Sequence, residues 1–175
     1  MKTLYKDLVE QTHSFPQEEF RVQDGNLMFH EIDLVDLVQR YGSPLKITYL
    51  PRISEQIHKT KSWFAEAMSK TNYKGKYSFA YCTKSAHFSF ILEECLKNQV
   101  DLETSSAFDI SIIQELKKQG KLPAKTNIIC NGFKPDAYIQ GIAELINAGD
   151  HNVTLIFDHK REPIELIIYL EKPCP

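Results

Sequence analysis

The sequence predicts an α/β fold built on a parallel sheet, and three observations lead to this prediction. Strand-like segments alternate with amphipathic helical segments from residue 44 onward. The last four strand-like segments have their midpoints 23, 26 and 27 residues apart, at Phe79, Leu102, Ile128 and Leu155. This spacing leaves room for one helix between successive strands, as parallel pairing through right-handed crossovers requires. The seven glycines include no adjacent pair and no G-x-G-x-x-G motif, so a dinucleotide-binding sheet is not indicated.

The expected elements follow one another in a regular order. A polar, turn-rich start with one short hairpin around Asp24-Gly25 precedes a helical stripe over residues 31–41, which ends before Gly42. Ser43-Pro44 then breaks the helix, so we expect residues 1–43 to form an N-terminal extension with a lead-in helix, and residues 44–175 to form a β/α domain. In that domain we expect strands over residues 44–49, 77–82, 100–105, 127–130 and 153–158, and helices over residues 51–70, 86–99, 107–119, 135–148 and 163–172.

Two architectures fit this alternation, an open doubly wound sheet and a (β/α)8 barrel. A complete barrel takes about 250 residues and eight strands, whereas the sequence indicates four barrel-type strands, roughly half of that number. The sequence also stops at EKPCP just after a helix, with nothing to cover the last strand. Because an uncovered strand edge favours aggregation, we expect the 175 residues to be the N-terminal part of a longer polypeptide.

Composition and charge argue against several classes of function. The chain is 42% hydrophobic, and its formal net charge of -2 with scattered basic residues indicates no nucleic-acid partner. No apolar run approaches the ~18 residues of a membrane span, and residues 1–15 lack the apolar core of a signal peptide. Neither a C-x-x-C pairing nor a zinc-type histidine spacing accompanies the cysteines Cys82, Cys95, Cys130 and Cys174. We therefore expect a cytoplasmic protein without a metal site, a disulfide framework or a membrane partner.

Lys84, at the end of the strand-like run YSFAYCTK, is the candidate for chemistry. Strand alternation places Ser78, Ala80 and Cys82 on one face and, if it continues through Thr83, adds Lys84 to that face. In a barrel this is the C-terminal end of a strand, where active sites lie, and a partly desolvated lysine there suits Schiff-base chemistry. The competing interpretation is a solvated lysine that pairs with a surface carboxylate, and geometry alone favours it.

Five motifs, in the appropriate order and spacing, resemble those of the fold-type III pyridoxal-phosphate decarboxylases, which act on ornithine, arginine and diaminopimelate. The resemblance spans residues 42–166. Within it, the segments YCTKSAHF and ETSSAFDI are most similar to those of bacterial arginine decarboxylases. It implies an alanine-racemase-like (β/α)8 barrel of the TIM type with about half of its strands present, so that residues 44–175 would be an incomplete pyridoxal-phosphate-binding domain. The five motifs are YGSPLKITY, YCTK (for Y-A-x-K), LETSSAFDI, IICNGFKPDAYI with its N-x-x-K turn at Asn131 and Lys134, and IFDHKREPIEL.

The resemblance also implies roles for individual residues. Lys84 would be the catalytic lysine that holds pyridoxal 5'-phosphate as a Schiff base, and Glu103 and Asp109 would help to bind the cofactor. For Glu103 the alternative is an ordinary ion pair at the sheet end, and for Asp109 it is complementation of the helix dipole. Ser105 and Ser106 are expected to cap the helix that follows them rather than to catalyse. His87 is expected to be a capping or surface histidine, because the family's ring-stacking histidine belongs to a later strand.

The implied function is decarboxylation of a basic amino acid, arginine to agmatine, in polyamine (spermidine) biosynthesis by a cytoplasmic homodimer with shared active sites. The family's glycine-rich phosphate loop and its substrate-binding residues lie outside this segment, so we expect the 175 residues alone to be inactive. The segment does not distinguish arginine from ornithine, lysine or diaminopimelate. Two alternatives remain, a single-barrel pyridoxal-phosphate-binding homeostasis protein and a non-catalytic regulatory homologue of the decarboxylases. The lead-in strand argues against the first, and the presence of Lys84 argues against the second.

Overall fold

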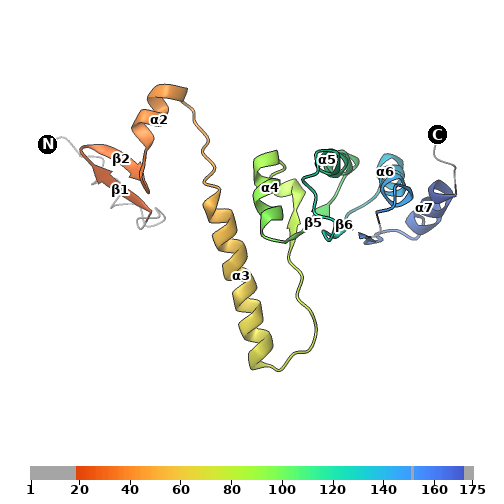
Figure 1. Cartoon of the computed structure of the whole chain (residues 1–175). Coiled ribbons are helices and arrows are strands. Elements are labelled where there is room, and N and C mark those ends of the chain that lie inside the picture. Colours follow the sequence, from red (N-terminus) through yellow and green to blue (C-terminus); the bar gives the residue numbers. More distant parts are fainter. Residues whose placement is uncertain (1–18, 151, 172–175) are drawn as a thin grey trace. The chain divides into compact units, whose positions relative to one another are not determined.

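The computed structural model describes residues 19–150 and 152–171 (Figure 1). They belong to two compact units, which divide between Thr48 and Tyr49. The expectations for residues 1–15 and for Cys174 lie outside the described residues. Within the described part, none of the helices combines the length and the apolar character that crossing a membrane requires.

The first unit contains a small antiparallel sheet followed by one helix. The hairpin expected around Asp24-Gly25 is confirmed, because both residues have positive φ, 52° and 83°, as a two-residue turn between strands requires. The helix starts later than residue 31, because the carboxylate of Asp33 caps it by accepting from the N–H groups of Val35 and Asp36 at 2.8 and 3.0 Å. The elements of this unit are β1 (Phe20–Gln23), β2 (Asn26–Phe29), β3 (Ile32–Asp33) and α2 (Leu34–Tyr41).

The strand predicted over residues 44–49 is not formed. The segment is non-helical, but it joins neither sheet of the described residues. A β-strand is defined by the ladder hydrogen bonds of a neighbouring strand, and no described strand pairs with this segment. The prediction was wrong on this point, because strand-like composition does not by itself supply a partner.

The second unit confirms the predicted alternation of strands and helices. Its four strands form one parallel sheet in the order β4-β5-β6-β7. The long helix predicted over residues 51–70 has those bounds in the structure, with Pro51 in its first turn. The elements are α3 (Pro51–Lys70), β4 (Ala80–Cys82), η1 (Thr83–Ser85), α4 (Ser89–Lys97), β5 (Asp101–Thr104), α5 (Ala107–Lys118), β6 (Ile128–Cys130), α6 (Asp136–Asn147), β7 (Val153–Leu155) and α7 (Glu162–Leu170).

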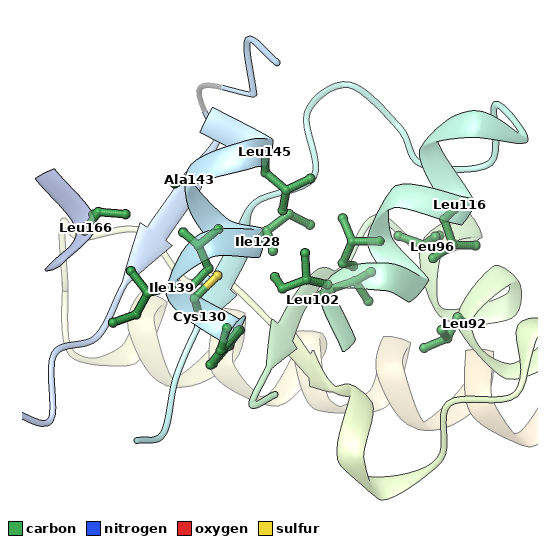
Figure 2. Close-up of a cluster of buried hydrophobic side chains, with 14 residues drawn as sticks. Leu92, Leu96, Leu102, Leu116, Ile128, Cys130, Ile139, Ala143, Leu145 and Leu166 are labelled. Atoms are coloured by element: carbon green, nitrogen blue, oxygen red, sulfur yellow. The ribbon is translucent and has the colours of Figure 1, made fainter. Parts of the chain in front are cut away.

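The main hydrophobic core lies between one face of this sheet and the helices α4 to α7 (Figures 1 and 2). Leu102, Ile128 and Cys130 point from the strands into this core, and each is at most 4% exposed. Strand alternation turns Glu103 and Ile129 to the opposite face, which we call the open face. In a doubly wound sheet helices cover both faces, whereas here the helices of the four β/α units cover one.

A smaller core joins α3 to α4 and to the start of β5. Ile57 of α3 packs with Ile91 and Cys95 of α4, and Val100 completes the cluster. The Nζ atom of Lys61 in α3 donates to the carbonyl oxygens of Asn98 and Gln99 at 2.7 and 3.0 Å, just after α4 ends. These contacts attach α3 beside the strand that leads to Lys84.

Candidate functional site

Lys84 lies on a short turn at the C-terminal end of β4. The strand stops at Cys82, and residues 83–85 form the single 3-10 turn η1. Thr83 is fully buried and its Oγ1 donates to the carbonyl oxygen of Glu103 at 2.9 Å, which anchors the turn to β5. The condition for placing Lys84 on the face of Ser78, Ala80 and Cys82, that strand alternation continues through Thr83, is not met, because the 3-10 turn begins at Thr83. Lys84 itself is exposed.

The ammonium group of Lys84 makes no hydrogen bond to the described residues, unlike the ammonium groups of several other lysines. Lys61, Lys117 and Lys134, for example, each donate hydrogen bonds to carbonyl or carboxylate oxygens. In the part of the chain that the structure describes, no hydrogen bond or salt bridge engages the side chain of Lys84. The interpretation of Lys84 as a surface lysine paired with a carboxylate therefore finds no such carboxylate among the described residues.

Three polar side chains lie at the same end of the open face, one from each of three neighbouring strands or their ends. Cys82 stands opposite Glu103 in the register of β4 and β5, and its Sγ lies 3.6 Å from Oε1 of Glu103. Asn131, which directly follows β6, donates from Nδ2 to the same oxygen at 3.2 Å. Glu103 points away from Leu102 and Thr104, since these two residues are fully buried and Glu103 lies on the open face.

The electrostatic surroundings of Cys82 reflect this arrangement. Burial raises the pKa of the Cys82 thiol above its ordinary value, and the charge and hydrogen bond of Glu103 raise it further. The positive charge of Lys84 acts in the opposite direction on the same thiol. Glu103 and Lys84 thus both act on Cys82, so a carboxylate and an amine of opposite charge occupy one end of the sheet.

The opposite end of the open face carries a second polar cluster that the sequence did not reveal. Asp101, at the start of β5, accepts hydrogen bonds from Ser78 and from both the backbone and the side-chain nitrogens of Asn127. Burial opposes ionisation of Asp101, but these hydrogen bonds outweigh it and hold its pKa below the ordinary value. This cluster lies at the N-terminal ends of the strands, away from Lys84.

Asp109 is buried in the first turn of α5. Its Oδ2 accepts from the backbone N–H of Ser105 at 2.9 Å and from the hydroxyl of Ser106 at 2.9 Å, and the residue is 3% exposed. Ser106 is the N-cap of α5, as predicted, and its Oγ accepts in return from the N–H of Asp109 at 3.3 Å. These contacts order the loop beside the site, and a role of Asp109 in cofactor binding stays a prediction.

His87 lies at the surface, as expected, between η1 and α4. Its ring contacts Phe108 edge to face, with 5.5 Å between the ring centroids. Phe108 in the first turn of α5 and Phe88 at the N-cap of α4 are 63% and 51% exposed, so two aromatic rings are exposed near the turn that carries Lys84.

A buried ion pair joins the ends of β6 and β7. Nζ of Lys134 lies 3.4 Å from Oε2 of Glu162, donates to the carbonyl oxygen of Gly132 at 2.8 Å and also donates to that of Ile156. The carboxylate of Glu162 also accepts from the backbone N–H groups of Lys134 and Asp158 at 3.1 and 3.0 Å. The sequence marked Lys134 as part of an N-x-x-K turn but did not indicate Glu162, whose position 28 residues later forms no local pattern.

The fold is similar to that of part of two solved amino-acid decarboxylases. Two solved structures superpose on the chain at 22% sequence identity, which shows the fold alone. A biosynthetic arginine decarboxylase from Campylobacter jejuni gives a TM-score of 0.67 over 90% of this chain and 28% of its own. A diaminopimelate decarboxylase from M. jannaschi gives a TM-score of 0.51 over 75% of this chain and 32% of its own.

Sequence comparison points to the same group of proteins. Biosynthetic arginine decarboxylase 2 of Synechocystis sp. is 26% identical over 155 residues, which are 81% of this chain and 23% of the relative. The biosynthetic arginine decarboxylase of Gloeobacter violaceus is 31% identical over 120 residues, 63% of this chain and 18% of the relative. No protein-family model matches the sequence. The chain is thus a distant homologue of the biosynthetic arginine decarboxylases and spans less than a quarter of the length of these curated relatives.

Proposed function

We propose that the chain is the lysine-bearing part of a pyridoxal-phosphate-dependent decarboxylase, with arginine as the substrate and Lys84 as the residue that attaches the cofactor. The observation that carries this proposal is the position of Lys84, which is exposed and without a hydrogen-bond partner among the described residues at the C-terminal end of β4. Distant homology to arginine decarboxylases supports the reaction class and, less directly, the substrate.

The proposed architecture is part of a (β/α)8 barrel. The chain has four parallel strands, and the helices of the β/α units cover one face of their sheet. Half of a (β/α)8 barrel would have the same arrangement. The open face would then be the barrel interior, and Lys84, Glu103 and Asn131 would lie at the end where barrel enzymes carry their active sites.

The residues present fit a part of the cofactor's requirements. Lys84 presents a primary amine, the group that captures an aldehyde, on a turn anchored to the neighbouring strand. Glu103 places a carboxylate on the same end of the open face, where it can balance a positive charge on the attached nitrogen. When bound, pyridoxal phosphate supplies an electron sink for the bond that breaks at the substrate Cα. Contacts to the phosphate and to the ring nitrogen are not assigned to the described residues.

The attachment residue is tested by reductive trapping on a polypeptide that carries this chain at the length of its relatives. The protein is incubated with pyridoxal phosphate, reduced with borohydride and digested, and the modified lysines are mapped by mass spectrometry. We expect Lys84 to be modified ahead of the other exposed lysines, and Lys84→Arg, which keeps the charge but cannot form the imine, to remove that label. Lys125→Arg is the matched control, because Lys125 is exposed but precedes β6 at the other end of the sheet. If the exposed lysines were modified to the same extent, with neither substitution changing the pattern at the remaining lysines, the proposal would be contradicted.

The substrate is tested on a polypeptide that carries this chain at the length of its relatives. Release of CO2 is compared for arginine, ornithine, lysine and diaminopimelate, and we expect arginine to be preferred and Lys84→Arg to abolish the release. Modification of Lys84 without release of CO2 from any of the four would instead favour a cofactor-binding protein that is not a decarboxylase.

A further inference from the structure

Asn131 occupies a defined place on the open face. It directly follows β6, and its backbone N–H donates to the carbonyl oxygen of Thr104 at 2.9 Å, which continues the parallel pairing of β5 and β6 by one residue. Ile128 and Cys130 face the helices, so alternation turns the side chain of Asn131 to the open face, beside Glu103.

The orientation of the Asn131 amide follows from its hydrogen bonds. The backbone N–H of Gly132 points at Oδ1 of Asn131 at 2.8 Å. Since an N–H group can only donate, the atom that faces it must be the amide oxygen, and the amide nitrogen must be the group that faces Glu103. Gly132 has a φ of 76°, a conformation that residues other than glycine rarely adopt, and the turn there places its N–H against the preceding side chain.

The same carboxylate oxygen of Glu103 is approached from both neighbouring strands. Nδ2 of Asn131 lies 3.2 Å from Oε1 on the β6 side, and Sγ of Cys82 lies 3.6 Å from it on the β4 side. The amide is a strong donor held by its own backbone contacts, whereas a thiol is a weak donor. The position of the carboxylate is therefore governed by Asn131 rather than by Cys82.

We propose that Asn131 is a positioning residue that holds the carboxylate of Glu103 beside Cys82, at the end of the open face that carries Lys84. The relevance of this position to cofactor binding rests on the proposed function, but the contact itself is a property of the chain. Asn131 would act through Glu103 and would not itself touch the reacting atoms.

Cys82 provides a reporter for the position of Glu103 that needs no cofactor. Its thiol responds to the Glu103 charge on β5 and to the opposite charge of Lys84 on η1. The rate of alkylation by iodoacetamide measures the thiolate fraction, and it can be followed in a Cys174→Ser background. Cys95 and Cys130 are fully buried, and Cys82→Ser in this background identifies any rate that they contribute.

We expect Glu103→Gln to increase the alkylation rate of Cys82 at pH 8 by about threefold or more, because removal of the adjacent negative charge favours the thiolate. We expect Asn131→Ala to produce most of this increase, since the released carboxylate moves away from Cys82. The double variant should react like Glu103→Gln alone. If Asn131→Ala does not fold by circular dichroism, Asn131→Ser, which is polar but too short to reach Glu103, replaces it.

Asn127→Ala is the matched control, because Asn127 donates to the carboxylate of Asp101 at the other end of the same strand. It should leave the alkylation rate of Cys82 unchanged. Two results would overturn the proposal. One is a wild-type rate in Asn131→Ala. The other is an equal acceleration by Asn131→Ala in the Glu103→Gln background, which would indicate general loosening. Neither outcome depends on trapping at Lys84, so the two proposals can fail separately.

Discussion

At the scale of single residues, the Lys134–Glu162 pair joins segments that the local sequence does not connect. Both residues are 2% exposed, and their charged groups are satisfied by each other and by backbone atoms from the ends of β6 and β7. Burial opposes ionisation of Glu162, but hydrogen bonds from the backbone of Asp158 and Lys134, together with the Lys134 charge, outweigh it and lower the pKa of Glu162. Such a pair depends strongly on both partners being present.

Lys134→Met should therefore lower the free energy of unfolding by about 3–5 kcal/mol, because it leaves a carboxylate buried without its cation. The measurement is equilibrium unfolding in urea. Lys70→Met is the control, because the Lys70–Glu66 pair is exposed, at 71% and 61% for the two side chains, and exposed pairs contribute little. An equal effect of both substitutions would contradict a special role for the buried pair.

The lowered pKa of Glu162 also predicts a pH dependence. A carboxyl whose folded pKa lies below its unfolded value stabilises the fold fully above the unfolded value, and this contribution is lost as the pH falls through the folded value. Glu162→Gln should thus be less stable than the wild type at neutral pH, and the difference should shrink as the pH falls through the acid range. Unfolding curves at a series of pH values test this, and a difference that does not change with pH would contradict it.

At the scale of elements, α5 illustrates how local chemistry sets the start of a helix. Ser106 and Asp109 satisfy each other's backbone and side-chain groups at its N-terminus, in a reciprocal arrangement like a capping box. The same contacts hold the loop that follows Glu103, so the start of α5 and the shape of the site are set by the same residues.

Ser106→Ala should lower the free energy of unfolding by about 1 kcal/mol, because the helix loses its N-cap acceptor and Asp109 loses a donor. Ser111→Ala is the matched control, since Ser111 lies exposed within the same helix, where alanine is the better helix former. Thermal unfolding followed by circular dichroism compares the two. A loss in Ser111→Ala as large as that in Ser106→Ala would show that the cap is not the cause.

The elements differ in how far the sequence could predict them. The helix α3 was predicted with its observed bounds, because Pro51 and the helical spacing of its apolar residues are local signals. The end of β4 at Cys82 was predicted as well, but the 3-10 turn η1 after it was not, because its anchor is the contact of Thr83 with the carbonyl oxygen of Glu103 on another strand. The direction of Glu103 follows from strand alternation, whereas the contact between Glu103 and Asn131 depends on the register of β5 against β6.

At the scale of the whole molecule, each compact unit has its own packing. The hydrophobic clusters of the second unit are built from residues between Leu50 and Leu170 and include none from the first. The first unit is built around the β1-β2-β3 sheet and α2. The parts that carry Lys84, Glu103 and Asn131 all belong to the second unit.

A polypeptide of residues 49–175 should therefore unfold cooperatively without the first unit. We expect its far-ultraviolet circular dichroism to retain the helical signal of α3 to α7, and urea to give a single transition. The intact chain is the reference. Loss of the cooperative transition in the shorter polypeptide would show that the first unit is required for this fold.

The anchored turn beneath Lys84 affects how much order the amine must gain when it binds a partner. Thr83 ties the backbone there to β5 during folding, so the cost of ordering that backbone, about 1–2 kcal/mol per residue, is met before any ligand arrives. What remains is the rotamer entropy of the lysine side chain, about 2 kcal/mol. The turn thus combines an ordered backbone with a lysine side chain that keeps its rotamer freedom. Binding at the amine would therefore have to restrict only the side chain, at a modest entropic cost.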